Sequence, residues 1–287
     1  MNNPLNITSL NRLMEISEGD NNIVIGLIDG PVKLDHPAFL ESNIKTLTQD
    51  QYLNCKNSSS LACMHGTFIA GILSSKRGLP SPAICPKCTL LVHPVFMEAP
   101  NSNKNEFNIP STTPELLSNA ILETINAGAK IINLSLNLLD THNLLHIKPL
   151  YEIYQYAAKK DILIVNAAVN NGYIGQTSLP HWIIPVTSCS ESGNISTQTN
   201  IGPTIGTRGL MAPGINITST AASGGYNTSS GNSIAAAFVT GTLALLWSIF
   251  PTKNASELKH SILRQNKRTI IPPLLDAYTA FQILKNN

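Results

Sequence analysis

The chain has 287 residues, of which 43% are hydrophobic and 13% are charged, and its formal net charge is +2. A chain of this length and composition can bury a large core, which excludes disordered and coiled-coil proteins and favours one large α/β domain. The 19 Lys and Arg residues are distributed along the chain without a cluster, and 17 Asp and Glu residues nearly balance their charge. Because nucleic-acid binding needs a concentrated basic surface, we expect no nucleic-acid partner.

Targeting and membrane signals are weak in this sequence. The first twenty residues contain neither a basic segment nor the continuous apolar run of a secretory signal. The most apolar stretch, residues 234–250, is interrupted by Thr240, Gly241, Thr242 and Ser248, so it falls short of a membrane span. We therefore expect a cytoplasmic protein with no membrane partner; the sequence gives no indication of its oligomeric state.

Strand and helix patterns alternate along the chain. The expected strands are residues 23–28, 89–96, 130–136, 162–168 and 183–187, and the expected helices are residues 65–73, 114–127, 151–160, 233–250 and 256–264. Residues 233–250 are so apolar that this helix should be buried on every side. The region 188–231, rich in Gly, Ser, Thr and Asn, predicts turns and short antiparallel strands. Together these patterns predict an α/β fold with a mainly parallel sheet.

The five cysteines are an odd number, and only Cys85 and Cys88 form a Cys-x-x-Cys motif. This motif lies in a Pro-rich turn before a strand, whereas a redox motif normally opens a helix. A zinc site would need two more ligands, and the eight-residue spacing of Cys55 and Cys63 matches no common zinc ribbon. We expect turn cysteines or a local disulfide, and no metal or cofactor.

Three short motifs carry residues suited to nucleophilic catalysis. Asp29 ends the first expected strand, His65 begins a helix of small and apolar residues, and Ser233 begins the most apolar helix. A serine hydroxyl is a poor nucleophile until a neutral imidazole takes its proton, and a carboxylate then holds the imidazole in the required tautomer. Each of these motifs taken alone is found at least as often in a structural role as in a catalytic one. Their order and local context, over residues 20 to 250, resemble the subtilisin superfamily.

The resemblance implies a subtilisin-like three-layer sandwich, with a mainly parallel central sheet and helices on both faces. It also implies a serine endopeptidase with Asp29, His65 and Ser233 as its catalytic triad. In domain terms, residues 1–20 are expected to be a short N-terminal extension and residues 21–287 a single catalytic domain.

A fourth segment resembles the strand that supplies a side chain to the oxyanion hole of subtilases. Residues 164–172 read Ile-Val-Asn-Ala-Ala-Val-Asn-Asn-Gly, and Asn170 stands at the matching position. The resemblance implies that the Asn170 side chain and the backbone N–H of Ser233 stabilise the tetrahedral intermediate. Without the triad, the same residues would be read as an Asn-Asn-Gly turn.

Residues 131–137 resemble the subtilase strand that pairs with the substrate backbone. The resemblance implies that Ser135, Leu136, Asn137 and Ala167 bind an extended peptide by adding it as a strand. Asn137 and Leu138 stand where many subtilases have two glycines, which predicts a narrower pocket.

Two residues near Ser233 also depart from the usual pattern. Asn232 replaces the usual Thr, and Ala237 replaces the usual Pro. We expect Asn232 to keep a polar group beside the oxyanion hole, while Ala237 is a better helix former than Pro.

A finer resemblance is to the proteases that mature cyanobactins and related ribosomally made peptides, carried by residues 29–39 and 85–96. One branch removes a leader by hydrolysis, and another cyclises the peptide with an inserted helical cap between the Asp and His motifs. Because His65 follows Asp29 by only 36 residues, which leaves no room for such a cap, we expect hydrolysis of a precursor peptide. The alternatives are a transpeptidase or macrocyclase, or a catalytically silent fold that binds extended peptides.

Overall fold

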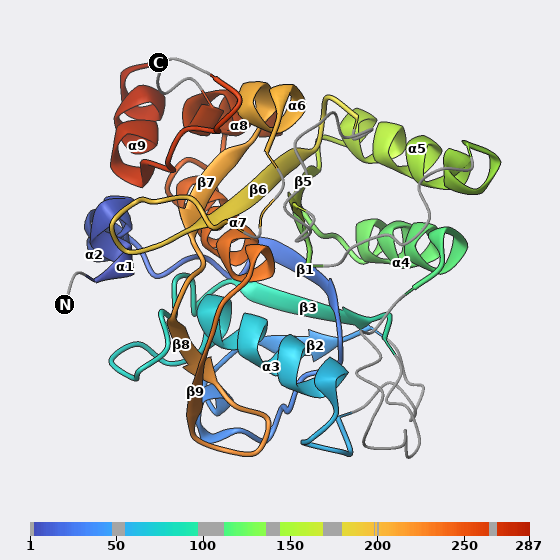
Figure 1. Cartoon of the computed structure of the whole chain (residues 1–287), viewed down its shortest axis with the longest axis vertical. Helices are drawn as coiled ribbons and strands as arrows, with labels where there is room; N and C mark the ends of the chain where they lie inside the picture. The colour runs from blue at the N-terminus through green and yellow to red at the C-terminus, as the bar shows by residue number, and fades with distance from the viewer. Residues whose placement is uncertain are drawn as a thin grey trace.

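A parallel seven-stranded sheet, in the order β2-β3-β1-β4-β5-β6-β7, forms the centre of the computed structural model (Figure 1). The structure describes residues 3–47, 55–96, 112–135, 144–168, 180–197, 199, 201–263 and 269–287. The strands are β1 Val24–Asp29, β2 Ile44–Thr46, β3 Thr89–Pro94, β4 Ile131–Leu134, β5 Leu163–Ala167, β6 Ile184–Cys189 and β7 Leu210–Pro213. The parallel order brings the carboxyl ends of β1, β4 and β5 to one edge, where ligands gather in α/β folds.

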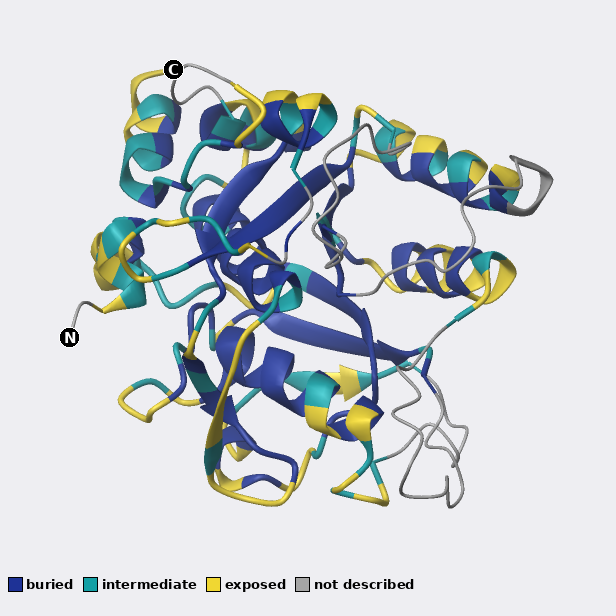
Figure 2. Cartoon of the chain, in the orientation of Figure 1, coloured by how far each residue is buried: buried dark blue, intermediate teal, exposed yellow. Residues whose placement is uncertain are grey.

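Helices cover both faces of this sheet (Figure 1). Helices α3 Leu61–Ser74 and α7 Asn232–Ile249 lie on one face, and α4 Pro114–Asn126 and α5 Leu144–Lys159 lie on the other. The central strands and the helix faces that pack on them are buried (Figure 2). Side chains that alternate along a strand enter two separate cores: Ile131 packs on the α7 side and Ile132 on the α4 side. The predicted three-layer α/β fold is confirmed.

Helix α7 is the central helix of the fold. It is the one described helix long and apolar enough to cross a membrane, yet 83% of it is buried inside the protein. It packs against β4, β5, β6 and β7, and against α3. Its apolar composition is therefore explained by burial on all sides, as the sequence predicted.

The two ends of the chain pack together on the α7 side of the sheet. The N-terminal helix α2 Leu10–Ile16, which follows α1 Pro4–Ile7, packs against the C-terminal helix α9 Ala277–Asn286, and α9 in turn packs against α8 Ala255–Leu263. Leu10 and Leu13 are fully buried in the main core. The N-terminal extension is thus tied to the body of the domain by apolar packing.

The remaining short elements are η1 Pro37–Phe39, α6 Pro203–Arg208 and an antiparallel hairpin of β8 Ile217–Thr220 and β9 Tyr226–Ser229. The hairpin agrees with the short antiparallel strands predicted for residues 188–231. Helix α3 begins at Leu61, before its predicted start at His65, because the Ser60 side chain accepts a hydrogen bond from the Cys63 N–H and caps the helix. His65 consequently sits within the second turn of α3 and not at its first residue.

Candidate active site

Asp29 is the last residue of β1 and is completely buried. Its Oδ1 accepts hydrogen bonds from the backbone N–H of Gly30 and from His65 Nδ1, both at 2.6 Å. Its Oδ2 is also buried and has no hydrogen-bond partner among the described residues. A buried carboxylate with two donors on one oxygen is well placed to hold an imidazole in a fixed orientation.

His65 reaches Asp29 because α3 lies very close to the turn after β1. A side chain on Gly30 would collide with the Ala62 carbonyl, and one on Gly66 would collide with the Gly30 carbonyl. These two glycines therefore permit the approach that puts Nδ1 against the carboxylate. Since Nδ1 donates its hydrogen to Asp29, the opposite ring nitrogen, Nε2, is left to accept a proton.

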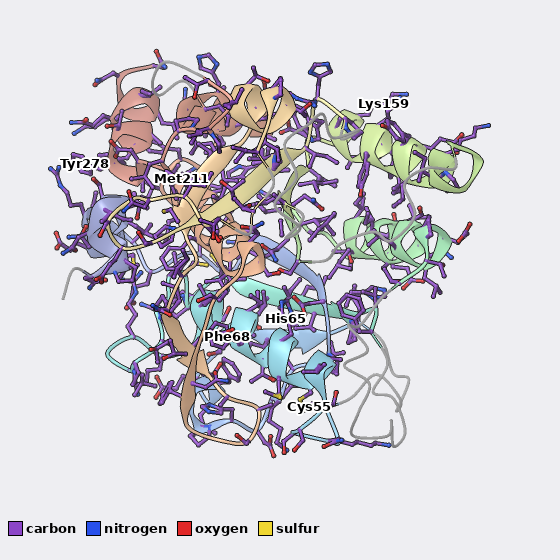
Figure 3. All side chains as sticks on the ribbon, in the orientation of Figure 1. Cys55, His65, Phe68, Lys159, Met211 and Tyr278 are labelled. Atoms are coloured by element: carbon purple, nitrogen blue, oxygen red, sulfur yellow. A yellow bond between two sulfur atoms is a disulfide. The ribbon has the colours of Figure 1, made fainter. Side chains whose placement is uncertain are left out.

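His65 lies on α3 (Figure 3), and its surroundings shift its pKa. Burial lowers the pKa of His65, but the charge of Asp29 and the hydrogen bond to it outweigh burial and raise the pKa above its ordinary value. The side chain remains 38% exposed, whereas Asp29 is 0% exposed. His65 thus presents an accessible edge to solvent while its inner edge is bound to a buried charge.

Ser233 is the second residue of α7, where helix N–H groups have no partner within the helix. Its Oγ donates a hydrogen bond to the Ser135 carbonyl at 3.2 Å. Within the described part of the chain, no hydrogen bond joins this hydroxyl to His65. The positive end of the α7 dipole at Ser233 favours negative charge developing beside it.

The Asn232 side chain makes three hydrogen bonds inside the protein. Its Nδ2 donates to the Ala168 carbonyl at 2.9 Å and to Thr199 Oγ1 at 2.7 Å, and its Oδ1 accepts from the Ser188 N–H at 2.7 Å. The residue is fully buried. Both amide hydrogens are used inside the protein, so this amide anchors the start of α7 to the end of β5 and to β6. Its expected place beside the oxyanion hole stays a prediction, because Asn170 lies outside the described residues.

The comparisons with known proteins agree with this geometry. A model of the Subtilase family matches residues 20–278. The chain belongs to the subtilase family. Among curated relatives, it is 27% identical to Mycosin-3 of Mycobacterium tuberculosis over 245 residues, which is 68% of this chain and 52% of that protein. The chain therefore spans about half the length of this curated relative.

Two solved structures are similar over nearly their whole length. The protease domain of PatA superposes with a TM-score of 0.81 at 27% identity, covering 93% of this chain and 97% of that one. The prenylagaramide maturation protease PagA superposes with a TM-score of 0.79 at 26% identity, covering 96% and 98%. The finer resemblance to peptide maturation proteases is confirmed.

The predicted substrate-binding residues of this subtilase are only partly described. Ser135 directly follows β4, and Ala167 is the last residue of the neighbouring strand β5. Both therefore lie at the edge where Asp29 ends β1. Leu136, Asn137 and the oxyanion candidate Asn170 lie outside the described residues, so their roles stay predictions.

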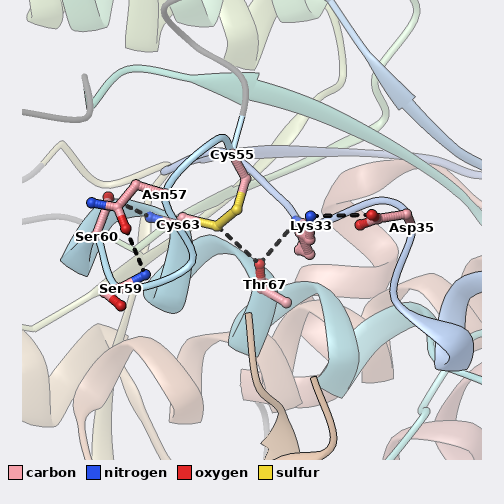
Figure 4. Close-up of a disulfide and its surroundings, with 8 residues drawn as sticks. All are labelled: Lys33, Asp35, Cys55, Asn57, Ser59, Ser60, Cys63 and Thr67. Atoms are coloured by element: carbon pink, nitrogen blue, oxygen red, sulfur yellow. Dashed lines mark hydrogen bonds and ion pairs between the residues drawn. A yellow bond between two sulfur atoms is a disulfide. The ribbon is translucent and has the colours of Figure 1, made fainter. Parts of the chain in front are cut away.

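A disulfide joins Cys55 to Cys63, two residues before His65 on α3 (Figure 4). Its Cα atoms are 5.3 Å apart. Thr67 lies one turn further along α3, where its Oγ1 is 3.8 Å from Cys63 Sγ and accepts from the Lys33 N–H at 2.9 Å. The sequence left the pairing of Cys55 and Cys63 open, because their eight-residue spacing only argued against a zinc ribbon.

The Cys-x-x-Cys residues Cys85 and Cys88 are free and buried, as is Cys189. A hydrogen bond with Cys88, together with burial, raises the pKa of the Cys85 thiol, and burial raises the pKa of Cys189 to about 12. Thiols of this kind are poor nucleophiles. In the described part of the chain, no group of three or more His, Cys, Asp and Glu side chains could hold a metal ion.

Proposed function

We propose that this subtilase is a serine endopeptidase in which Asp29, His65 and Ser233 form the catalytic triad. The observation that carries the proposal is the 2.6 Å contact between His65 Nδ1 and the buried Asp29 carboxylate. That contact leaves Nε2 as the proton acceptor at the edge of the sheet where Ser233 begins α7. Membership of a family whose named relatives include a thermophilic serine proteinase supports the assignment.

The reaction would proceed in two halves. His65 takes the proton of Ser233 as Oγ attacks the peptide carbonyl, and the same proton then goes to the leaving amine. Water then repeats the sequence on the acyl-enzyme and releases the acid product. Asp29 stabilises the imidazolium that forms in both halves.

The hydroxyl of Ser233 must leave the Ser135 carbonyl before it can meet His65. This would require the Ser233 side chain to rotate to another staggered position. The oxyanion that forms would be held by the backbone N–H of Ser233 and, we propose, by the side chain of Asn170.

We propose an extended precursor peptide as the substrate. PatA, a patellamide maturation protease, and PagA, a prenylagaramide maturation protease, align with almost the whole of this chain at 27% and 26% identity. The ends of β4 and β5 supply main-chain groups at Ser135 and Ala167 for pairing with such a peptide.

Hydrolysis is favoured over transpeptidation by the connection between β1 and α3. The described residues of this connection, 30–47 and 55–60, contain only η1 and the short strand β2. None of these forms the helical cap that would shield the acyl-enzyme from water. A macrocyclase is therefore the second candidate.

A cytoplasmic location stays a proposal. The Cys55–Cys63 disulfide weighs against it, because such bonds persist mainly in oxidising compartments.

The triad is tested with a fluorophosphonate probe followed by mass spectrometry of the intact and digested protein. Wild type should carry one adduct on Ser233, and Ser233→Ala and His65→Ala should carry none. Ser230→Ala is the matched control, because Ser230 is an exposed serine three residues before Ser233 and should not affect labelling. A folded wild type that takes up no probe would refute the proposed triad.

A further inference from the structure

A chain of hydrogen bonds lies in the core beneath Ser233. Thr240 Oγ1 donates to Asn133 Oδ1 at 2.8 Å, and Asn133 Nδ2 donates to Ser135 Oγ at 2.6 Å. Thr240 and Asn133 are 0% exposed and Ser135 is 5% exposed. The three polar side chains therefore satisfy one another in a place where water does not reach.

The chain begins and ends on the same helix. Thr240 lies about two turns after Ser233 on α7. Asn133 and Ser135 are two residues apart at the end of β4, so both side chains face α7, while Ile132 and Leu134 enter the opposite core. The Ser135 carbonyl then accepts from Ser233 Oγ at 3.2 Å, which closes a ring from α7 through β4 and back to α7.

This ring is unusual for the interface in which it lies. The residues of α7 around it are apolar, such as Ala236, Ala237 and Leu243. Thr242 is a buried threonine on the same helix that bonds within the helix: its hydroxyl donates to the Phe238 carbonyl at 2.8 Å. Thr240 instead donates across to β4, which fixes α7 against that strand.

We propose that Asn133 and Thr240 are positioning residues for the nucleophile. They hold Ser135 so that its carbonyl stays at one fixed place beside Ser233 Oγ and the path of the substrate backbone. Neither residue touches the reacting atoms. This inference rests on the proposed function, because it concerns the reactivity of Ser233.

The effect should be large because nucleophilic attack demands accurate placement of the reacting atoms. Thr240→Val keeps the shape and volume of the side chain but removes the donor, so Asn133 Oδ1 loses its partner and Asn133 can turn away from Ser135. Of the two hydrogen bonds of the ring that join α7 to the end of β4, only the one from Ser233 Oγ to the Ser135 carbonyl then remains.

The test compares Thr240→Val, Thr240→Ser and Thr242→Val. The measurement is the second-order rate constant at which Ser233 Oγ displaces fluoride from the fluorophosphonate and becomes phosphonylated, made well below the thermal midpoint of each variant. This rate depends on the same nucleophilic attack as acylation by a peptide and is used as the measure of acylation. Thr242→Val is the matched control, since it removes an equally buried threonine hydroxyl from the same helix without touching the ring. We expect Thr240→Val to acylate roughly tenfold more slowly than wild type, with Thr240→Ser and Thr242→Val close to wild type.

A second readout separates positioning from general base chemistry. The ring does not include Asp29 or His65, so the pH midpoint of acylation should be the same in Thr240→Val as in wild type, while the plateau rate falls. If Thr240→Val does not fold, Thr240→Ala replaces it, because the smaller alanine side chain needs less space in the core.

The outcomes are distinguishable. Wild-type acylation by folded Thr240→Val, or an equal slowing by Thr242→Val, would overturn the positioning role while leaving the triad intact. A folded wild type that is not labelled at Ser233 overturns both the triad and this inference. The positioning role is supported if Thr240→Val slows the acylation of Ser233 and Thr240→Ser restores the wild-type rate.

Discussion

Asn232 Nδ2 donates to the carbonyl of Ala168 at 2.9 Å, so the residue before the nucleophile is bound to the strand that leads to Asn170. The two halves of the expected oxyanion hole are the Ser233 N–H and the Asn170 side chain. The buried Asn232 amide ties the residue before Ser233 to Ala168, which stands two residues before Asn170 in the sequence. A substitution that removes the hydrogen bonds of Asn232 should therefore lower both the stability of the fold and the rate of acylation.

Asn232→Ala is expected to lower the free energy of unfolding by about 3 kcal/mol, because two buried backbone groups and a hydroxyl lose their partner. Denaturant unfolding measures this loss, and Asn227→Ala, at an exposed position of β9, should change it by less than about 0.5 kcal/mol. Slower acylation by Asn232→Ala with unchanged stability would contradict the anchoring role and return the amide to the oxyanion hole.

The pH dependence of acylation follows from the Asp29–His65 pair. His65 must be neutral to take a proton, and Asp29 raises its pKa above the ordinary value of about 6.5. The acylation rate should therefore rise with pH through a midpoint above that value. The same pairing stabilises the folded state fully below the unfolded pKa of His65, and this stabilisation is lost as pH rises through the folded pKa.

Stopped-flow acylation at a series of pH values measures the midpoint. His36 is the internal comparison, since it is buried at a turn where its ring bonds the Ala38 N–H and the Gly225 carbonyl. Replacing His36 should not move the midpoint. A midpoint at or below about 6.5 in wild type would contradict the charge effect assigned to Asp29.

Asp29→Asn should keep the fold but lower the acylation rate about 10⁴-fold, because an amide can hold the imidazole in the wrong tautomer. The midpoint of the remaining activity should shift to lower pH, since the charge that raises the His65 pKa is gone. Asp35→Asn is the control: Asp35 is an exposed carboxylate paired with Lys33 at 3.1 Å and should leave both quantities unchanged. A loss of less than tenfold in Asp29→Asn would argue against this carboxylate as the third member of the triad.

The fold and the contact between Asp29 and His65 could be predicted from the sequence because both depend on local patterns. The apolar run before Asp29, the small residues after His65 and the apolar helix after Ser233 each identify an element by itself. A parallel order then brings the ends of the strands together. The direction of the Asn232 amide could not be predicted in this way, because its partners Ser188, Ala168 and Thr199 become neighbours only when β5, β6 and α7 pack.

The ring through Asn133 and Thr240 was missed for the same reason. Thr240 and Thr242 are both small polar residues in an apolar helix, and the sequence does not distinguish the one that bonds β4 from the one that bonds its own helix. Alternation along residues 131–135 gave a usable signal, since a polar Asn133 falls on the same face as Ser135. A buried asparagine in a central strand needs partners, and Asn133 finds one on α7, at Thr240, and one just after its own strand, at Ser135.

Cys55 and Cys63 give the last prediction. Reduction of this disulfide frees the segment before α3 and should lower the free energy of unfolding by about 2 kcal/mol, the range expected for closing a short loop. Because Cys63 is two residues before His65, the same treatment should also slow acylation of Ser233.

The measurement is the thermal midpoint and acylation rate with and without a reductant, in wild type and in the double variant Cys55→Ser, Cys63→Ser. Cys189→Ser serves as the control, since Cys189 is a buried free thiol and this variant should respond to the reductant as wild type does. An equal response in the double variant would show that the reductant acts elsewhere, whereas insensitivity of that variant would tie the activity of this subtilase to the redox state of its surroundings.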